Sequence, residues 1–71
     1  MKLFIWEPQG HGQDIVVVVE ENLEKAQAAA NQFVEDTIAR TGVGYHYNGW
    51  GTEHYQLTTM DPGKVMTFEN S

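Results

Sequence analysis

Two patterns of hydrophobic and polar positions alternate along the chain, and each change of pattern marks a new element. Residues 2–6 and 14–19 are rich in aromatic and β-branched side chains, which is typical of strands. The segment between them contains a proline and two glycines, which predicts a loop. A parallel pair would need a crossover of about a dozen residues or more, so this short connection predicts an antiparallel pair.

From Leu23 onward, apolar residues recur at spacings of three and four, which predicts an amphipathic helix. The helix should end at Arg40 or Thr41. Asn22 is a suitable N-cap, and Gly42 fits the left-handed position after the last turn. The residues expected to form the apolar stripe are Leu23, Ala26, Ala30, Phe33, Val34 and Ile38.

The remainder of the chain predicts three more strands, at residues 43–47, 52–60 and 64–68. An Asn-Gly pair at 48–49 predicts a type I′ hairpin turn, in which both central residues have positive φ. Asp-Pro-Gly at 61–63 predicts a second hairpin turn. The expected fold class is therefore α+β, with one helix packed on an antiparallel sheet of four to five strands in the order β-β-α-β-β-β.

The first two predicted strands are apolar on both faces, because side chains alternate along a strand. Leu3 and Ile5 point opposite to Phe4 and Trp6, and the valines of the second strand divide in the same way. A single helix can cover only one face, so the other face needs a cover of its own. We expect a homodimer or a partner protein on the face formed by Phe4, Trp6, Val16 and Val18.

Length and charge limit the classes of function. The 71 residues predict a single domain over residues 1–71. Ten acidic against four basic residues give a formal charge of -6, which argues against direct binding to nucleic acid or to an anionic membrane. The chain has no cysteine, and its apolar runs are too short for a signal peptide or a membrane span, so we expect a cytoplasmic protein.

Three residues near the Asn-Gly loop suggest one possible binding chemistry. His46, Glu53 and His54 are residue types that bind zinc or ferrous iron, and they would serve a metal-binding or small-ligand module. With a loop of four residues, His46 faces Glu53 and His54 points to the other side of the sheet, whereas a loop of three or five residues would put both histidines on one face. Exposed strand histidines are the preferred interpretation, and no cofactor is predicted.

Catalytic patterns are weak. His11 lies in a Gly-His-Gly loop close to Asp14, where a general base is conceivable, although a polar loop residue is the simpler interpretation. Ser71 is the only serine, which argues against a Ser-His-Asp arrangement. We therefore predict that the protein is not an enzyme.

Acidic and aromatic residues suggest a contact with another protein. Trp50, at the tip of a loop, is predicted to anchor a partner. Acidic residues before and along the helix could occupy a basic groove, although charged helix faces are usually just solvated. The acids predicted to bind a partner are Glu20, Glu21, Glu24, Glu35 and Asp36.

The opening Lys-Leu-Phe-Ile-Trp-Glu at residues 2–7, followed by an apolar strand and an Ala-rich helix, resembles short uncharacterised proteins of bacteriophages and prophages. This resemblance implies a phage accessory product that acts by binding in the host cytoplasm, as anti-CRISPR inhibitors do. The preferred hypothesis is a non-enzymatic protein-binding module that inhibits a host CRISPR-type nucleic-acid-handling complex with a basic surface. A metal-binding or small-ligand module and a structural subunit of a larger assembly are the alternatives.

Overall fold

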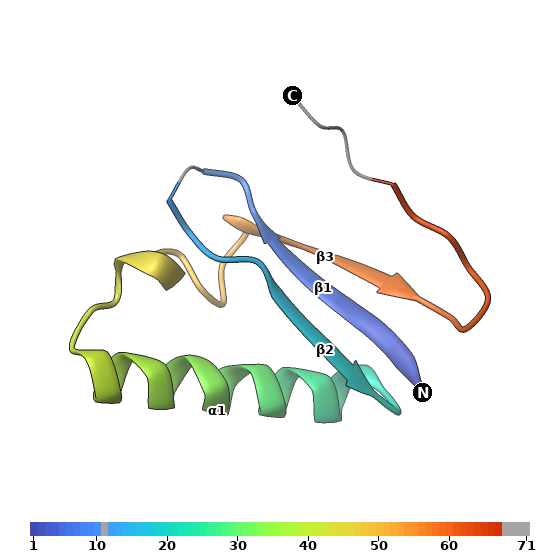
Figure 1. Cartoon of the computed structure of the whole chain (residues 1–71), viewed down its shortest axis with the longest axis horizontal. Coiled ribbons are helices and arrows are strands. Elements are labelled where there is room, and N and C mark those ends of the chain that lie inside the picture. Colours follow the sequence, from blue (N-terminus) through green and yellow to red (C-terminus); the bar gives the residue numbers. More distant parts are fainter. Residues whose placement is uncertain (11, 68–71) are drawn as a thin grey trace.

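The computed structural model describes residues 1–10 and 12–67 and shows one helix against a three-stranded sheet (Figure 1). The general expectation of an α+β fold with one helix on an antiparallel sheet is confirmed. In chain order, the elements are strand β1 (Lys2–Pro8), strand β2 (Val16–Glu20), helix α1 (Leu23–Thr41), the 3₁₀ helix η1 (Tyr45–Tyr47) and strand β3 (Tyr55–Met60).

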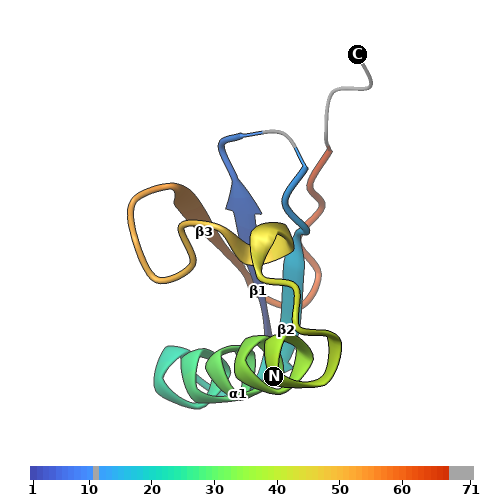
Figure 2. The same ribbon diagram turned by 90° about the vertical axis from the view of Figure 1, so that its left-hand side faces the viewer.

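The sheet has the order β2-β1-β3, and β1 pairs antiparallel with both neighbours. Figure 2 shows β2 and β3 on opposite sides of β1, with α1 below the sheet. The register places Ile5 between Val17 of β2 and Thr58 of β3, and it places Trp6 between Val16 and Leu57. Both β2 and β3 are therefore edge strands among the described residues.

Two of the predicted strands do not form in the described part of the chain. Within residues 43–47, the chain makes the short helix η1 instead of a strand. The turn at residues 61–63 is present, with the Lys64 N–H donating to the Asp61 carbonyl at 3.2 Å, but residues 64–67 do not form a strand after it. Phe68, the last residue of that predicted strand, lies outside the described residues. The prediction of four to five strands therefore exceeds the three that are seen.

The Asn-Gly turn also differs from the prediction. Asn48 has φ -60° and ψ 126°, and Gly49 has φ 85°. These angles are those of a type II turn, in which only the second central residue needs positive φ. The Trp50 N–H donates to the Tyr47 carbonyl at 2.9 Å across the turn. The chain therefore turns here without joining two paired strands, since η1 precedes it.

Both predicted helix caps are confirmed. The Asn22 side chain accepts a hydrogen bond from the Lys25 N–H at 2.9 Å, which satisfies a backbone donor of the first turn. Gly42 has φ 71°, and its N–H donates to the Ile38 carbonyl at 2.8 Å. This left-handed position favours glycine because a Cβ would be strained there.

The core lies between α1 and the face of the sheet that carries Phe4 and Trp6, and this corrects the predicted dimer face. Two fully buried alanines, Ala26 and Ala30, let α1 approach that face closely. The helix therefore covers the larger aromatic side chains, whose burial removes more apolar area from water. The four residues expected to stay open to a partner belong instead to this packed region, with Val18 partly buried: Phe4, Trp6, Val16 and Val18.

The open face of the sheet is the opposite one. It carries Leu3, Ile5, Val17 and Val19, which alternate with the residues under the helix. Ile5 is buried in the central strand, whereas Val17 and Val19 on β2 are 54% and 60% exposed. The expectation that one apolar face remains uncovered by the helix is correct, but the face was assigned wrongly.

Candidate interaction surface

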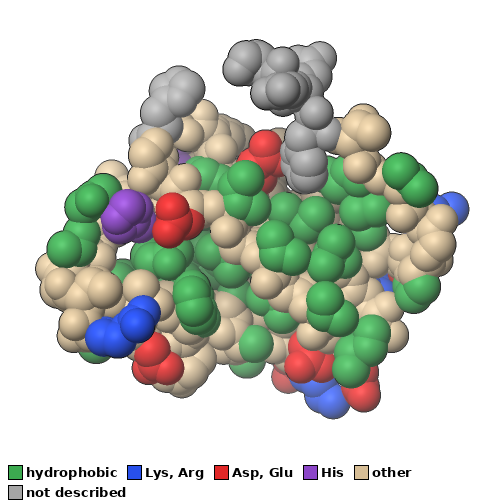
Figure 3. Space-filling model, in the orientation of Figure 1, with side chains coloured by type: hydrophobic (Ala, Val, Ile, Leu, Met, Phe, Trp, Pro, Cys, Tyr) green, Lys and Arg blue, Asp and Glu red, His purple; other side chains and the backbone are tan. Residues whose placement is uncertain are grey.

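A hollow of apolar character runs along β2, beside α1. Its volume is about 490 Å³. We call it the β2 groove, and it is lined by Ile15, Val16, Val17, Val18, Val19, Ala29, Ala30 and Phe33. Figure 3 shows hydrophobic side chains gathered in this region, over β2 and above α1. Every side chain that lines the groove is apolar, so the groove suits an aliphatic ligand surface rather than a charged one.

The main chain of β2 contributes to this surface as well as its side chains. On its inner side β2 pairs with β1, and no described segment pairs with its outer side. In an antiparallel sheet, alternate residues of an edge strand direct their N–H and C=O groups outward. The β2 groove therefore combines an apolar lining with an outward row of backbone donors and acceptors.

Apolar side chains remain exposed on both sides of this edge. On the open face of the sheet, Ile15, Val17 and Val19 are each more than half exposed. On the helix side, Phe33 is 53% exposed while its ring edge meets Tyr47, with ring centroids 6.4 Å apart. The patch is thus continuous around the outer edge of β2, and contiguous apolar patches of this kind mark interaction sites.

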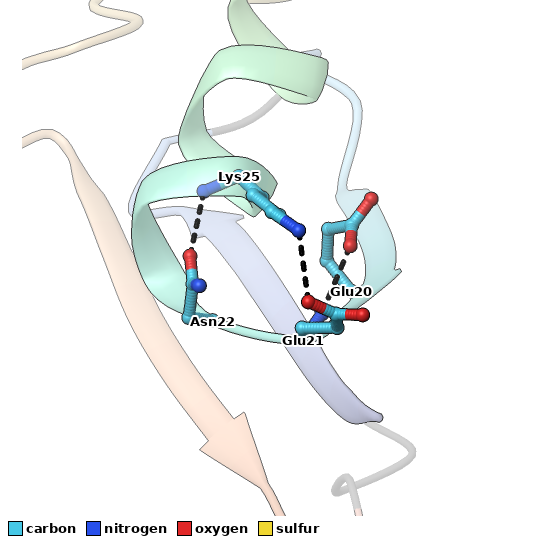
Figure 4. Close-up of polar contacts among 4 residues, drawn as sticks. All are labelled: Glu20, Glu21, Asn22 and Lys25. Carbon is cyan, nitrogen blue, oxygen red and sulfur yellow. Dashed lines mark hydrogen bonds and ion pairs between the residues drawn. The ribbon is translucent and has the colours of Figure 1, made fainter.

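The predicted acidic residues lie partly at the ends of the β2 groove. Glu20 ends β2, and its carboxylate accepts a hydrogen bond from the Glu21 N–H at 2.9 Å (Figure 4). The Lys25 ammonium lies 2.8 Å from the Glu21 carboxylate and compensates one of these charges. Glu24, in the first turn of α1, is exposed. This end of the groove therefore carries three acids and one base.

The other predicted acids do not join this cluster. Glu35 and Asp36 lie three turns further along α1, about 16–18 Å from Glu24 at 1.5 Å per residue. Asp36 accepts a hydrogen bond from the Gln32 side chain at 2.9 Å. The acids predicted to form one surface thus form two separate groups, and the first includes Glu20 at the end of β2.

Trp50 occupies a different place from the one expected for an exposed anchor. Its ring packs against Trp6 and Tyr55, with ring centroids 5.7 and 5.1 Å away, and it is only half-buried. Its indole N–H donates to the Asn31 side chain at 3.0 Å. These contacts hold the loop before β3 against the helix, which is a packing role.

The three residues of the possible metal site are not brought together. His46 lies in η1, whereas Glu53 and His54 follow the turn that begins at Asn48. Among residues 1–10 and 12–67, no cluster of three or more His, Asp or Glu side chains is arranged to hold a metal ion. The geometry therefore gives no support to the metal-binding alternative.

Asp14 contacts a different histidine from the one considered in the sequence. Its N–H donates to the His46 carbonyl at 2.8 Å, and its carboxylate lies 3.7 Å from the His46 Nδ1. The same carbonyl accepts a hydrogen bond from the Tyr55 hydroxyl at 3.3 Å. Burial, followed by the negative charge of Asp14 and by Tyr47, raises the pKa of Tyr55. His11, the candidate general base, lies outside the described residues.

Sequence reasoning missed the importance of the outer edge of β2. A run of five aliphatic residues from Ile15 to Val19 is typical of a strand with both faces buried, so it does not indicate an edge strand. Phe33 was assigned to the buried stripe of the helix because of its spacing. Only the strand order shows that both belong to an exposed groove.

No protein-family model matches the chain, and neither a curated protein nor a solved structure matches it. In the described part of the chain, no helix combines the length and the apolar character needed to cross a membrane.

Proposed function

We propose that the protein is a non-enzymatic protein-binding module and that the β2 groove is its principal contact surface. The observation that carries this proposal is the exposure of Val17, Val19 and Phe33 around an edge strand in a chain of only 71 residues. A domain of this size has little apolar area to spare, so leaving such residues in water weakens it unless a partner covers them.

The charge of the chain favours a basic partner. With a formal charge of -6, the protein attracts a positively charged surface and repels an acidic one. Complexes that handle nucleic acid present such basic surfaces. The resemblance to phage proteins adds a host defence complex of the CRISPR type as the partner class, with the protein acting as its inhibitor.

A capture experiment with matched variants tests the proposal. Val17 and Thr58 flank Ile5 in one row of the open face, so Val17→Lys and Thr58→Lys place the same charge on the two edges of the sheet. Immobilised wild type should capture a bacterial partner from lysate. Thr58→Lys should retain that partner. Val17→Lys should capture at least about tenfold less of it than wild type, because the variant places a charge in the apolar contact.

Circular dichroism of each variant provides the control for folding. Equal capture by all three proteins, or by none of them, would contradict a binding role for the β2 groove. Once a partner is purified, its cleavage of a nucleic-acid substrate can be measured with and without the protein. Unchanged cleavage at saturating protein would rule out the inhibitor part of the proposal and leave the binding part standing.

A further inference from the structure

We infer that the outer edge of β2 receives an extended segment of the partner as an added strand, and that this segment is aliphatic in its centre and carries Lys or Arg at both ends. This inference rests on the proposed function and specifies how the partner is recognised. Three features carry it: the unpaired main chain of β2, the apolar character of both its faces, and the acids at its two ends.

The main chain supplies the first feature. An added strand forms hydrogen bonds with the outward N–H and C=O groups of an edge strand, and these bonds do not depend on the partner's sequence. Edge strands usually carry charges, prolines or bulges that prevent such pairing. β2 is regular in its register with β1, and residues 16–19 are all valine. No residue within this stretch opposes the approach of another strand.

The side chains determine the chemistry of the partner's centre. An added strand would lie beside β2, and its side chains would alternate between the two faces of the sheet. On one side they would meet Val16, Val18 and Phe33 in the groove, and on the other Val17 and Val19 on the open face. Both sets of neighbours are apolar, so an uninterrupted aliphatic run fits better than one that alternates with charged residues.

The ends of β2 determine the chemistry of the partner's ends. Asp14 precedes the groove, with its carboxylate 3.7 Å from the His46 Nδ1. Glu20 and Glu21 follow the groove, and Lys25 compensates only the Glu21 carboxylate, at 2.8 Å. Lys2, which faces Glu20 across the sheet, instead pairs with Asp61 on the β3 side, at 3.4 Å. Both ends of the outer edge are therefore acidic, and basic residues at both ends of the added strand complement them.

The same charges disfavour a second copy of the chain as the occupant. An antiparallel pair of β2 strands centred on Val17 brings Glu20 of each copy towards Asp14 of the other. Like charges would then meet at both ends of the interface, and each copy already has a charge of -6. A basic partner segment avoids both penalties.

The test uses the whole protein and a short capped peptide, Lys-Lys-Val-Val-Val-Val-Val-Lys-Lys, with binding followed by NMR titration. The control peptide has Glu in place of every Lys. We expect the β2 amides to shift with the basic peptide and its affinity to exceed that of the acidic peptide by about tenfold, with the difference shrinking as salt is added. Glu20→Lys should reduce this preference, whereas Glu35→Lys, three turns along α1, should leave it within about twofold.

Backbone methylation separates strand addition from binding through side chains alone. An added strand pairs through one of its edges, so only every second N–H of the peptide is needed. N-methylation of one alternating set of the central residues should weaken binding by at least about tenfold, and methylation of the other set should change it by less than about twofold. Equal weakening by both sets would overturn strand addition.

Three other results would overturn the inference. One is no binding of the basic peptide, and another is equal binding of the two peptides. The third is a doubled molecular mass by light scattering that Val17→Lys abolishes, because it would identify a second copy as the occupant. If these tests fail while capture of a partner still depends on Val17, the proposed binding function survives and only the mode of recognition is wrong.

Discussion

The two edge strands of the sheet pair with the same central strand but expose different chemistry. Across Ile5, β2 places Val17 where β3 places Thr58, and β3 also exposes Gln56. Polar residues on an edge strand keep its open side solvated and discourage association with other chains. The β3 edge follows this rule and the β2 edge breaks it, which makes β2 the edge that is suited to a partner.

The segments beside the two strands also differ. The loop before β3 is held by Trp50 and by the Gln9 N–H, which donates to the His54 carbonyl at 2.9 Å. After β2, the chain turns directly into α1, and the contacts of Glu20, Glu21 and Lys25 there are exposed. Aromatic packing thus holds the loop before β3, whereas the turn after β2 is held by exposed polar contacts.

Truncating Trp6, which packs against both edge strands, should have the largest effect on the free energy of unfolding. Trp6 is buried between Val16 of β2 and Leu57 of β3. Trp6→Ala should lower the free energy of unfolding by about 3–5 kcal/mol, which is comparable to the whole stability of a domain this small. Urea unfolding followed by circular dichroism measures it. Val65→Ala, at an exposed position, should stay within about 0.5 kcal/mol of wild type.

A retained cooperative transition at nearly wild-type urea concentration in Trp6→Ala would show that the two edges do not share one core. Trp6→Phe keeps most of the apolar volume, so it should lose less stability than Trp6→Ala and remain folded. This second variant keeps the prediction testable if Trp6→Ala does not fold.

The next prediction concerns the β3 side alone. Gly49 and Gly51 both have φ 85°, so alanine at either position is strained by about 1–2 kcal/mol. A Cβ at Gly49 would also lie 2.8 Å from the His54 Cβ, whereas a Cβ at Gly51 would meet no atom within 4 Å. Gly49→Ala should therefore destabilise the protein by about 1 kcal/mol or more beyond Gly51→Ala.

Thermal or urea unfolding of the two glycine variants gives the comparison directly. Because both variants carry the same backbone strain, the difference between their free energies of unfolding isolates the contact with His54. Equal losses of stability would mean that the loop before β3 relaxes around the added Cβ without cost.

The helix and the first strand pair could be predicted from the sequence because their signals are local. Asn22 and Gly42 cap α1 as expected, and the short connection makes β1 and β2 antiparallel. Residues 43–47 could not be predicted in the same way. Their aromatic character favours a strand, but the aromatic rings of η1 pack without a strand ladder, since Tyr47 is buried and meets Phe33 edge-on.

The candidate surface was harder to predict than the fold. Both faces of β1 and β2 are apolar, so local alternation identifies two faces but does not say which one the helix covers. That choice depends on the fit of Phe4 and Trp6 against the small side chains Ala26 and Ala30, which is a tertiary property. Whether β2 is an edge strand depends in turn on how many later segments join the sheet, and the sequence predicts more strands than the three seen among the described residues.

The smallest expected effect is a dependence on pH that again concerns the β3 side. Tyr55 begins β3, and burial first, then Asp14 and Tyr47, raises its pKa above the ordinary value of 10.0. The folded state therefore holds the phenol proton more tightly than the unfolded state. This contribution to stability is complete below pH 10 and is lost as the pH rises through the higher pKa of the folded state.

Unfolding in urea at several pH values above 9 measures this loss. Tyr55→Phe should flatten the decline of stability above pH 10, because it removes the titrating group, whereas Tyr45→Phe, at an exposed position, should keep the wild-type slope. Parallel slopes for wild type and Tyr55→Phe would show that Tyr55 ionises equally easily in both states.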